Sequence, residues 1–188
     1  MKITVKDIIH DSDPRIRLKS KKVELPLNAE DRELLEAMIT YVRDSQNDEI
    51  AQREDLQPAV GIAAIQLGIA KKMIAVVVPD EEDETGETNI EYALVNPRII
   101  SESVQNSYLE GGEGCLSVPE TRPGHVFRHA RVRVRGYDML TDQEVTIKAD
   151  GFLAICLQHE IDHLSGVLYF DHIDSKNPWK EDKNAEVI

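Results

Sequence analysis

The feature that most constrains this chain is an apolar run near its C-terminal end that also carries ionisable side chains. The run extends from Phe152 to Leu164, and Gly166 follows it as a typical C-terminal stop for a helix. Its composition predicts a largely buried helix. Inside the run stands the sequence His159-Glu160-Ile161-Asp162-His163. The chain must therefore fold so that a core helix can hold two histidines and two carboxylates.

The two histidines are placed to act together. A step of four residues rotates about 400° along a helix, so His159 and His163 share one face, one turn apart. Two neutral imidazoles in this position can bind one metal ion. The alternative is a pair of buried histidines bonded to backbone carbonyls. Because burying both histidines and Glu160 without a partner charge is costly, a metal site is the favoured interpretation.

A catalytic metal site of this kind needs a third protein ligand and keeps one position open for water. Downstream residues are poor candidates, because a metzincin would have a histidine where this chain has Tyr169, and His172 comes too late. Glu181 and Glu186 lie in a tail, Asp174 to Ile188, to which we assign no regular structure. The cysteines are the remaining candidates, since thiolates bind zinc and iron(II) well.

The two cysteines differ in their surroundings. Cys156 and His163 are about 10.5 Å apart along a helix axis, at about 1.5 Å per residue, so both cannot reach one metal beside His159. The apolar neighbours of Cys156 predict a core residue. Cys115 instead follows a glycine-rich run, Gly111 to Gly114, that lets the backbone approach a ligand closely.

The whole chain, residues 1–188, is expected to form one α+β domain. Its composition, 41% hydrophobic and 30% charged, is that of a globular protein. Apolar residues at helical spacing between Leu34 and Val42 predict an early amphipathic helix of about four turns, capped by Asn28. The run from Ala59 to Gln66 reads as a tight buried strand. Further strands are predicted at Met73–Val78, Tyr92–Ser103, Ala130–Tyr137 and Gln143–Ala149.

The charge of the chain argues against nucleic acid as a specific partner. Its 22 Lys and Arg against 35 Asp and Glu give a net charge of −13, which repels phosphate backbones at long range. The acidic run from Asp80 to Glu87 predicts a solvated loop. One stretch of the chain is rich in arginine. Its simplest interpretation is the solvated face of a strand, and a weaker alternative is that it attracts acidic peptides or ribosomal RNA. It contains Arg122, Arg128, Arg131, Arg133 and Arg135.

Several features indicate the cytoplasm. No apolar stretch approaches the roughly 20 residues that a transmembrane helix needs. The first residues, Met1 to Arg17, mix acidic and basic side chains, unlike a secretory or organellar leader. Two cysteines cannot staple a chain of this size with disulfides. We therefore expect a cytoplasmic protein without membrane contact.

Three ordered motifs resemble those of the peptide deformylase family. The family has a glycine-rich run ending in Ala-Ala-x-Gln, then Glu-Gly-Cys-Leu-Ser, then a His-Glu motif that ends in Asp-His. The corresponding segments here are Ala59–Gln66, Glu113–Ser117 and His159–His163. Their order and spacing also agree, so the resemblance extends from about Lys6 to Asp171. The acidic insertion resembles the branch of the family that is common in Gram-positive bacteria.

The resemblance implies a fold and a metal centre. The fold would be α+β, with mixed, mainly antiparallel sheets packed around the buried C-terminal helix. Cys115, His159 and His163 would hold a metal ion with a water in its fourth position. Glu160 would take the proton of that water as general base and pass it to the leaving amine. Iron(II) is the metal usually associated with the family, and zinc, nickel or cobalt can occupy the same ligands.

The resemblance also implies a substrate and its contacts. The substrate would be the N-formyl-methionyl end of a nascent peptide, processed by a monomer in transient contact with the ribosome. The Gln66 side-chain amide and the Leu116 backbone N–H would stabilise the oxyanion. Val60, Gly61 and Gly114 would contact the peptide.

Two positions depart from the family pattern, and two others have open roles. Ala59 stands where the family usually has a glycine, so it could narrow the cleft or oppose a left-handed backbone. Ile65 stands where proline or threonine is usual. Glu113 and Asp162 either orient the metal ligands or form simple salt bridges.

Three other functions were weighed against this one. If the chain were another type of metallopeptidase, it would have no credible third metal ligand. A structural zinc site would need four protein ligands, usually cysteine pairs at short spacing, which this chain does not have. A metal-stabilised binding module would keep its ligand affinity when Glu160 is removed, whereas an enzyme would lose its activity.

Overall fold

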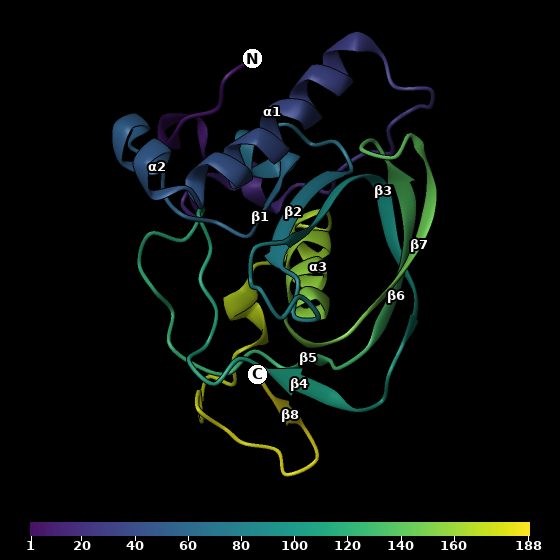
Figure 1. Ribbon diagram of the computed structural model, residues 1–188. Coiled ribbons are helices and arrows are strands. Elements are labelled where there is room, and N and C mark those ends of the chain that lie inside the picture. The colour runs from purple at the N-terminus through teal and green to yellow at the C-terminus, as the bar shows by residue number, and fades with distance from the viewer.

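Strand β2 (Met73–Pro79) lies at the centre of the molecule because helices cover both of its faces. The computed structural model describes residues 1–188 (Figure 1). The odd-numbered residues from Met73 to Val77 share a core with helix α1 (Ala29–Ser45), and the even-numbered ones share a second core with helix α3 (Gly151–His163). This two-sided burial explains why the strand is a continuous apolar run without polar alternation.

Two sheets surround helix α3. The larger sheet has the strand order β1–β2–β3–β6–β7, and each neighbouring pair is antiparallel. In the smaller sheet, β4 lies between β5 and β8, and only the pairing of β8 with β4 is parallel. The predicted α+β class, with mainly antiparallel sheets around the C-terminal helix, is confirmed. The remaining strands are β1 (Gly61–Ala63), β3 (Asn89–Glu102), β4 (Asn106–Tyr108), β5 (Arg128–His129), β6 (Val132–Asp138), β7 (Gln143–Ala149) and β8 (Glu186–Val187).

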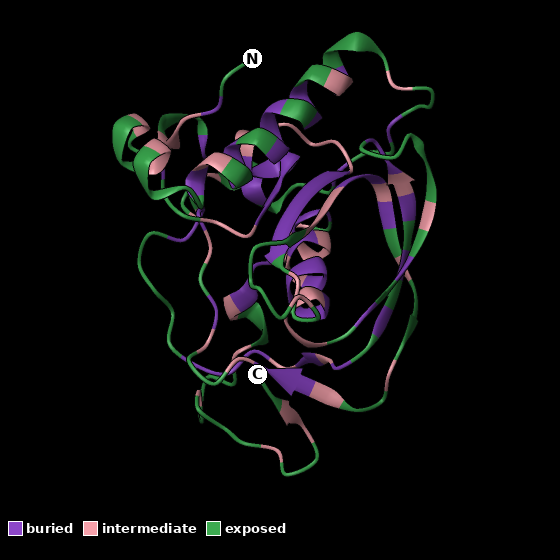
Figure 2. Cartoon of the chain, viewed as in Figure 1, coloured by how far each residue is buried: buried purple, intermediate pink, exposed green.

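Helix α1 begins and buries its side chains as its sequence predicts. The Asn28 side chain accepts a hydrogen bond from the Asp31 backbone N–H at 2.8 Å, which caps the first turn. The apolar residues from Leu34 to Val42 are buried, while the opposite side of the helix faces solvent (Figure 2). At 17 residues, the helix is slightly longer than the four turns expected.

Helix α3 is largely buried, and the turn that follows it contains a required glycine. Figure 2 shows it mostly buried beside β2, as its apolar composition predicts. The predicted stop, Gly166, has a φ of 73°, and a Cβ there would lie 2.2 Å from the Arg17 carbonyl oxygen. The close approach of the N-terminal segment therefore demands glycine at this position.

Some elements differ from the sequence expectation. The Ala59–Gln66 segment forms only the short strand β1, after which the chain turns into a 3-10 helix at Ala64–Leu67. A second helix, α2 (Asp48–Glu54), was not predicted. The tail, Asp174–Ile188, ends in β8, whose pairing with β4 is set by tertiary contact and leaves no periodic signal. Other 3-10 helices lie at Val5–Asp7, Pro14–Arg17 and Tyr169–His172.

The acidic segment lies where its composition predicts. Asp80 to Glu87 forms a loop between β2 and β3 with mostly exposed residues. None of the helices combines the length and the apolar character that a membrane crossing requires.

We expect the Leu157→Ala substitution to lower the free energy of unfolding by about 2–5 kcal/mol, because it opens a cavity at a fully buried position of α3. Urea denaturation measures the change. The control is Leu140→Ala, at a residue that is 39% exposed, which should change stability by no more than about 0.5 kcal/mol. Equal effects of the two substitutions would contradict the central position of α3.

Candidate metal centre

Cys115, from a distant loop, meets two histidines of helix α3. Cys115 comes from the loop between β4 and β5, and His159 and His163 come from the last turns of α3. One ligand atom of each lies within 4.8 Å of those of the other two. The Cys115 Sγ atom is 3.4 Å from His163 Nε2, and the two imidazole rings are 5.0 Å apart. The structure thus brings together the three residues that the sequence nominated as metal ligands.

The donor set and its surroundings fit a divalent metal ion. A thiolate and two imidazoles suit zinc and iron(II) better than magnesium or calcium, which prefer oxygen ligands. His163 is 1% exposed, and its Nδ1 has no hydrogen-bond partner. Such a cluster of buried polar groups would be costly without a cation to bind.

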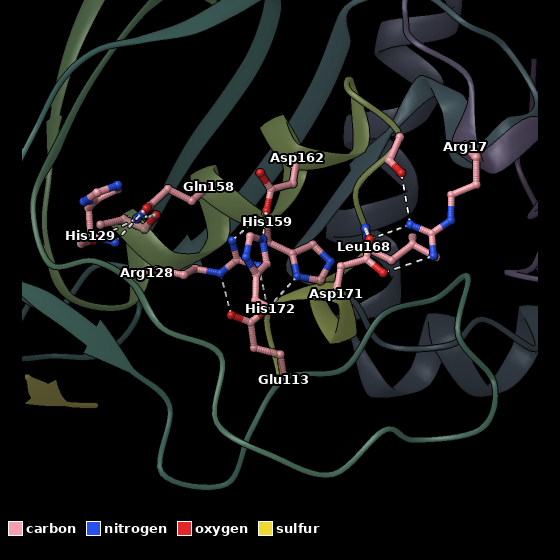
Figure 3. Close-up of polar contacts among 12 residues, drawn as sticks. Arg17, Glu113, Arg128, His129, Gln158, His159, Asp162, Leu168, Asp171 and His172 are labelled. Atoms are coloured by element: carbon pink, nitrogen blue, oxygen red, sulfur yellow. Dashed lines mark hydrogen bonds and ion pairs between the residues drawn. The ribbon is translucent and has the colours of Figure 1, made fainter. Parts of the chain in front are cut away.

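Glu113 orients one of these histidines (Figure 3). The His159 Nδ1–H donates to Glu113 Oε2 at 2.8 Å, which leaves Nε2 with its lone pair available to a metal. Burial alone would raise the pKa of Glu113, but hydrogen bonds from Arg128 and His159 outweigh it and lower the pKa to about 2. Glu113 is therefore an anion that fixes the direction of the His159 ring.

Arg128 holds Glu113 in place with a two-pronged ion pair. Its Nε and one terminal nitrogen donate to the two Glu113 oxygens at 2.6 and 2.9 Å. Its other terminal nitrogen donates to Asp162 at 3.0 Å, and Asp162 also accepts a hydrogen bond from His172 at 2.7 Å. Figure 3 shows this chain of contacts from His172 to His159. Glu113 orients a ligand and forms a salt bridge at the same time.

Arg128 is buried, contrary to the prediction of a solvated strand face. It was grouped with the exposed arginines, but it is 4% exposed, because it lies in β5 and points toward Glu113. Arg133 and Arg135, by contrast, are exposed on one side of β6, as their alternation predicts. Nothing in the local sequence distinguishes Arg128, because Arg122, which is equally out of step with that alternation, is exposed.

Glu160 is buried beside the two histidines and close to strand β1. Burial raises its pKa to about 7, and its Oε2 has no hydrogen-bond partner. A Cβ on Gly61 would lie 2.5 Å from Glu160 Oε1 and 2.8 Å from Cγ and Cδ. Only glycine at position 61 leaves this carboxylate room to face the cavity.

Gln66 presents its amide nitrogen to the same place. Its Oε1 accepts a hydrogen bond from the Ala63 backbone N–H at 2.8 Å, and because an N–H can only donate, this bond fixes the orientation of the amide. The NH2 group therefore faces Cys115 Sγ at 3.5 Å and Ser117 Oγ at 3.2 Å. Leu116, between these two residues in sequence, also borders the cavity.

These groups open into a cavity of about 380 Å³. The three residues nominated for substrate contact, Val60, Gly61 and Gly114, all line it. Strand β1 is an edge of the larger sheet, so one side of its backbone is not paired with another strand. Apolar lining residues that the sequence analysis did not nominate are Pro58, Leu109, Phe152 and Ile155. Nothing in their local sequence marks them.

The unusual residues of the first motif have different environments. Ile65 is fully buried in the core and does not line the cavity. Ala59 lines the cavity and has no positive φ, so its backbone is not strained by the side chain. Cys156 is buried as predicted, and burial raises the pKa of its thiol, but it also lines the cavity.

Comparisons with known proteins agree with these motifs. The sequence profile of the polypeptide deformylase family matches residues 5–179. Peptide deformylase 2 of Bacillus subtilis is 48% identical over 186 residues, which cover 99% of this chain and 98% of that protein. A peptide deformylase of Staphylococcus epidermidis is 46% identical over 183 residues, 97% of this chain and 98% of that protein.

A solved structure gives the same result for the fold. Peptide deformylase from Ehrlichia chaffeensis in complex with actinonin has a TM-score of 0.71 and 31% sequence identity to this chain. The match covers 95% of this chain and 92% of that one.

The two cysteines allow a matched test of the metal centre. We expect metal-depleted protein to rebind one zinc or iron(II) ion per chain, and Cys115→Ala to weaken that binding by at least about 100-fold, since it removes a ligand. Competition with a chromophoric chelator measures the affinity. Cys156→Ala should leave it unchanged, and an equal loss in both variants would contradict this assignment.

Proposed function

The chain belongs to the peptide deformylase family, in its Gram-positive-type branch, and from that premise we propose how its residues remove the formyl group from N-formyl-methionyl peptides. The observation that carries the proposal is the convergence of Cys115, His159 and His163 beside a cavity that the Glu160 carboxylate, with one oxygen unpaired, also lines. In the overall reaction, water attacks the formyl carbon, the C–N bond breaks, and formate and a free amine are released.

Cys115, His159 and His163 hold the metal ion in this proposal. A divalent ion there supplies Lewis acidity, which makes a water molecule nucleophilic at neutral pH. We propose iron(II) as the native ion, with zinc, nickel or cobalt as substitutes, because thiolate and imidazole donors accept all of them. The Glu113 carboxylate accepts a hydrogen bond from the Nδ1–H of His159 and so would leave Nε2 free to bind such an ion.

Glu160 moves the proton. It takes a proton from the attacking water and passes it to the amine nitrogen as the C–N bond breaks. Its position supports this role, because it lines the cavity, follows His159 directly and has one oxygen without a partner. Gly61 keeps its path to the substrate open.

Two hydrogen-bond donors stabilise the oxygen of the attacked carbonyl. The Gln66 amide nitrogen is held toward the site by its bond to Ala63, and the Leu116 backbone N–H is the second donor. Each such donor is worth about 2.7–4 kcal/mol in the transition state. Because Gln66 is already oriented, no free energy is lost to arranging it during the reaction.

The peptide binds between two backbone segments. Gly61 offers the unpaired edge of β1, Val60 lies just before it, and Gly114 offers the facing loop. An extended peptide can add to such an edge through main-chain hydrogen bonds, which depend little on sequence. The apolar lining, which includes Phe152 and Ile155, suits a methionine side chain.

The exposed side of β6 and β7 supports a transient ribosome contact. Arg133 lies opposite Lys148 in the strand register, and neither forms an ion pair, whereas Arg131 and Arg135 are paired with Glu186 and Glu144. Like charges directly opposite each other are unfavourable in isolation, and phosphates of ribosomal RNA would relieve this repulsion. A monomer in the cytoplasm meets nascent chains there.

Removal of the base should abolish the reaction. We expect Glu160→Gln to slow formate release from a formyl-methionyl tripeptide by at least about 100-fold, with metal content unchanged, and Gly61→Ala to slow it by displacing the same carboxylate. Formate and free amine are measured with anaerobically prepared iron(II) protein. An acetylated peptide is the control and should not react. Wild-type turnover in the Glu160→Gln variant would refute the base, and an inert wild type would refute the function.

The ribosome contact predicts a change in salt dependence. We expect Arg133→Ala with Lys148→Ala to weaken co-sedimentation with ribosomes and to reduce the slope of log affinity against log salt by about 1 per lost phosphate contact. Deformylation of a free tripeptide should be unchanged. Replacement of the exposed Lys183 serves as the control, and an unaltered slope in the double variant would refute this contact.

A further inference from the structure

One wall of the catalytic cavity has no regular secondary structure of its own. This wall segment, Leu109–Leu116, follows β4 and contributes five residues to the lining, including Leu109, Gly114 and Cys115. Its position therefore depends on the contacts that anchor it. Those contacts come from two different parts of the chain.

The half of the wall segment near Cys115 is anchored in the core. The residue after the segment, Ser117, accepts a backbone hydrogen bond from Asp11 at 2.7 Å, and its hydroxyl lies 3.2 Å from the Gln66 amide nitrogen. Glu113 is held by Arg128. Ser117 is fully buried. The half that carries the metal ligand Cys115 is thus fixed independently of the C-terminal end of the chain.

The half near Leu109 is anchored by the C-terminal segment, Asp174–Ile188. The Glu110 backbone N–H donates to the Ile188 oxygen at 3.0 Å. The Glu110 carbonyl oxygen lies 3.2 Å from Nε2 of His125, whose Nδ1 lies 2.8 Å from the Lys180 carbonyl oxygen. The Glu110 backbone N–H is therefore tied to the C-terminal segment, and its carbonyl oxygen lies against an imidazole that contacts the same segment.

Side-chain packing closes the same contact. The Trp179 ring meets the His125 ring edge-on at 5.0 Å, and its Cη2 would lie 3.7 Å from a Cβ on Gly112. Gly112 has a φ of 79°, and that Cβ would lie 2.8 Å from the Gly124 carbonyl oxygen. His125 is 7% exposed, and its backbone N–H donates to Pro178 at 2.8 Å. The C-terminal segment, the wall segment and the loop at His125 thus contact one another, with 47% of Trp179 left exposed (β8 and C in Figure 1).

We propose that the C-terminal segment is a brace for the substrate side of the cavity, and that His125 and Trp179 are positioning residues for peptide binding. The inference rests on the proposed function, because it assigns the wall segment to the formylated peptide. Loss of the brace frees Leu109 to Gly112 to move, so the peptide must order this part of the wall when it binds. Cys115 keeps its own anchors, so metal binding and the chemical step are preserved.

The proposal predicts a separation of kinetic constants. Trp179→Ala should raise KM for a formyl-methionyl tripeptide about 3- to 10-fold, the equivalent of one lost aromatic contact. It should leave kcat within about twofold and the bound metal unchanged. Trp179→Phe should restore KM, because a phenyl ring can still meet His125 edge-on. Lys183→Ala, at an exposed residue of the same segment, is the matched control and should have no effect.

Trp179 also supplies a readout that does not depend on turnover, because it is the only tryptophan in the chain. A deformylated methionyl tripeptide should leave acrylamide quenching of Trp179 nearly unchanged in the wild type, where the wall is already braced, and should reduce it in His125→Ala, where binding must order the wall. His125→Ala should raise the quenching in the free protein and raise KM as Trp179→Ala does. Circular dichroism confirms that the variants fold.

The outcomes are distinct. An unchanged KM in Trp179→Ala, or no rescue by Trp179→Phe, would overturn the proposal. A rise in KM accompanied by a fall in both kcat and bound metal would also overturn it, because it would show a general structural role. If the wild type released no formate, the proposed function would fail before any variant is compared.

Discussion

The buried ion pair between Arg128 and Glu113 is the contact on which the rest of the site depends. Both residues are less than a tenth exposed, and charges in such a place are tolerated only when they are paired and fully hydrogen-bonded. Glu113 belongs to the loop that carries Cys115, Arg128 belongs to β5, and the remaining guanidinium nitrogen reaches Asp162 in α3. One guanidinium thus joins the loop, the smaller sheet and the central helix. These are the parts that must meet before a cysteine and two histidines can converge.

Around that pair, the site is organised before any ligand binds. The carboxylate of Glu113 sets the tautomer of His159, and the Ala63 N–H sets the orientation of the Gln66 amide. The absence of a side chain is equally important at Gly61, where any Cβ would displace Glu160. Each polar group that the proposed reaction uses is therefore held by a neighbour that does not react. Such support is what allows donors to act without reorganising during the chemical step.

The sequence predicts the parts of the molecule that local signals specify. The early helix was found from its cap at Asn28 and its apolar spacing, and the central helix from its apolar run between glycines. The convergence of Cys115 with the two histidines was anticipated from motif resemblance, not from physics alone. Arg128 and strand β8 were missed for a different reason. Their structures are determined by partners far away in the sequence, Glu113 and β4, and a one-dimensional pattern carries no record of such pairings.

The two sides of the cavity are supported in different ways, and this asymmetry bears on substrate selection. The β1 side is part of the larger sheet, and Ala59 is tied to α1 through the Gln46 side chain at 2.9 Å and the Ser45 hydroxyl at 3.1 Å. Movement there would disturb the core that β2 shares with both helices. In the facing wall segment, Glu113 is tied to β5 and α3, whereas the C-terminal segment supplies the contacts nearest to Leu109. Substitutions in that segment can therefore adjust how the wall meets a peptide at little cost to the core, whereas substitutions in β1 cannot.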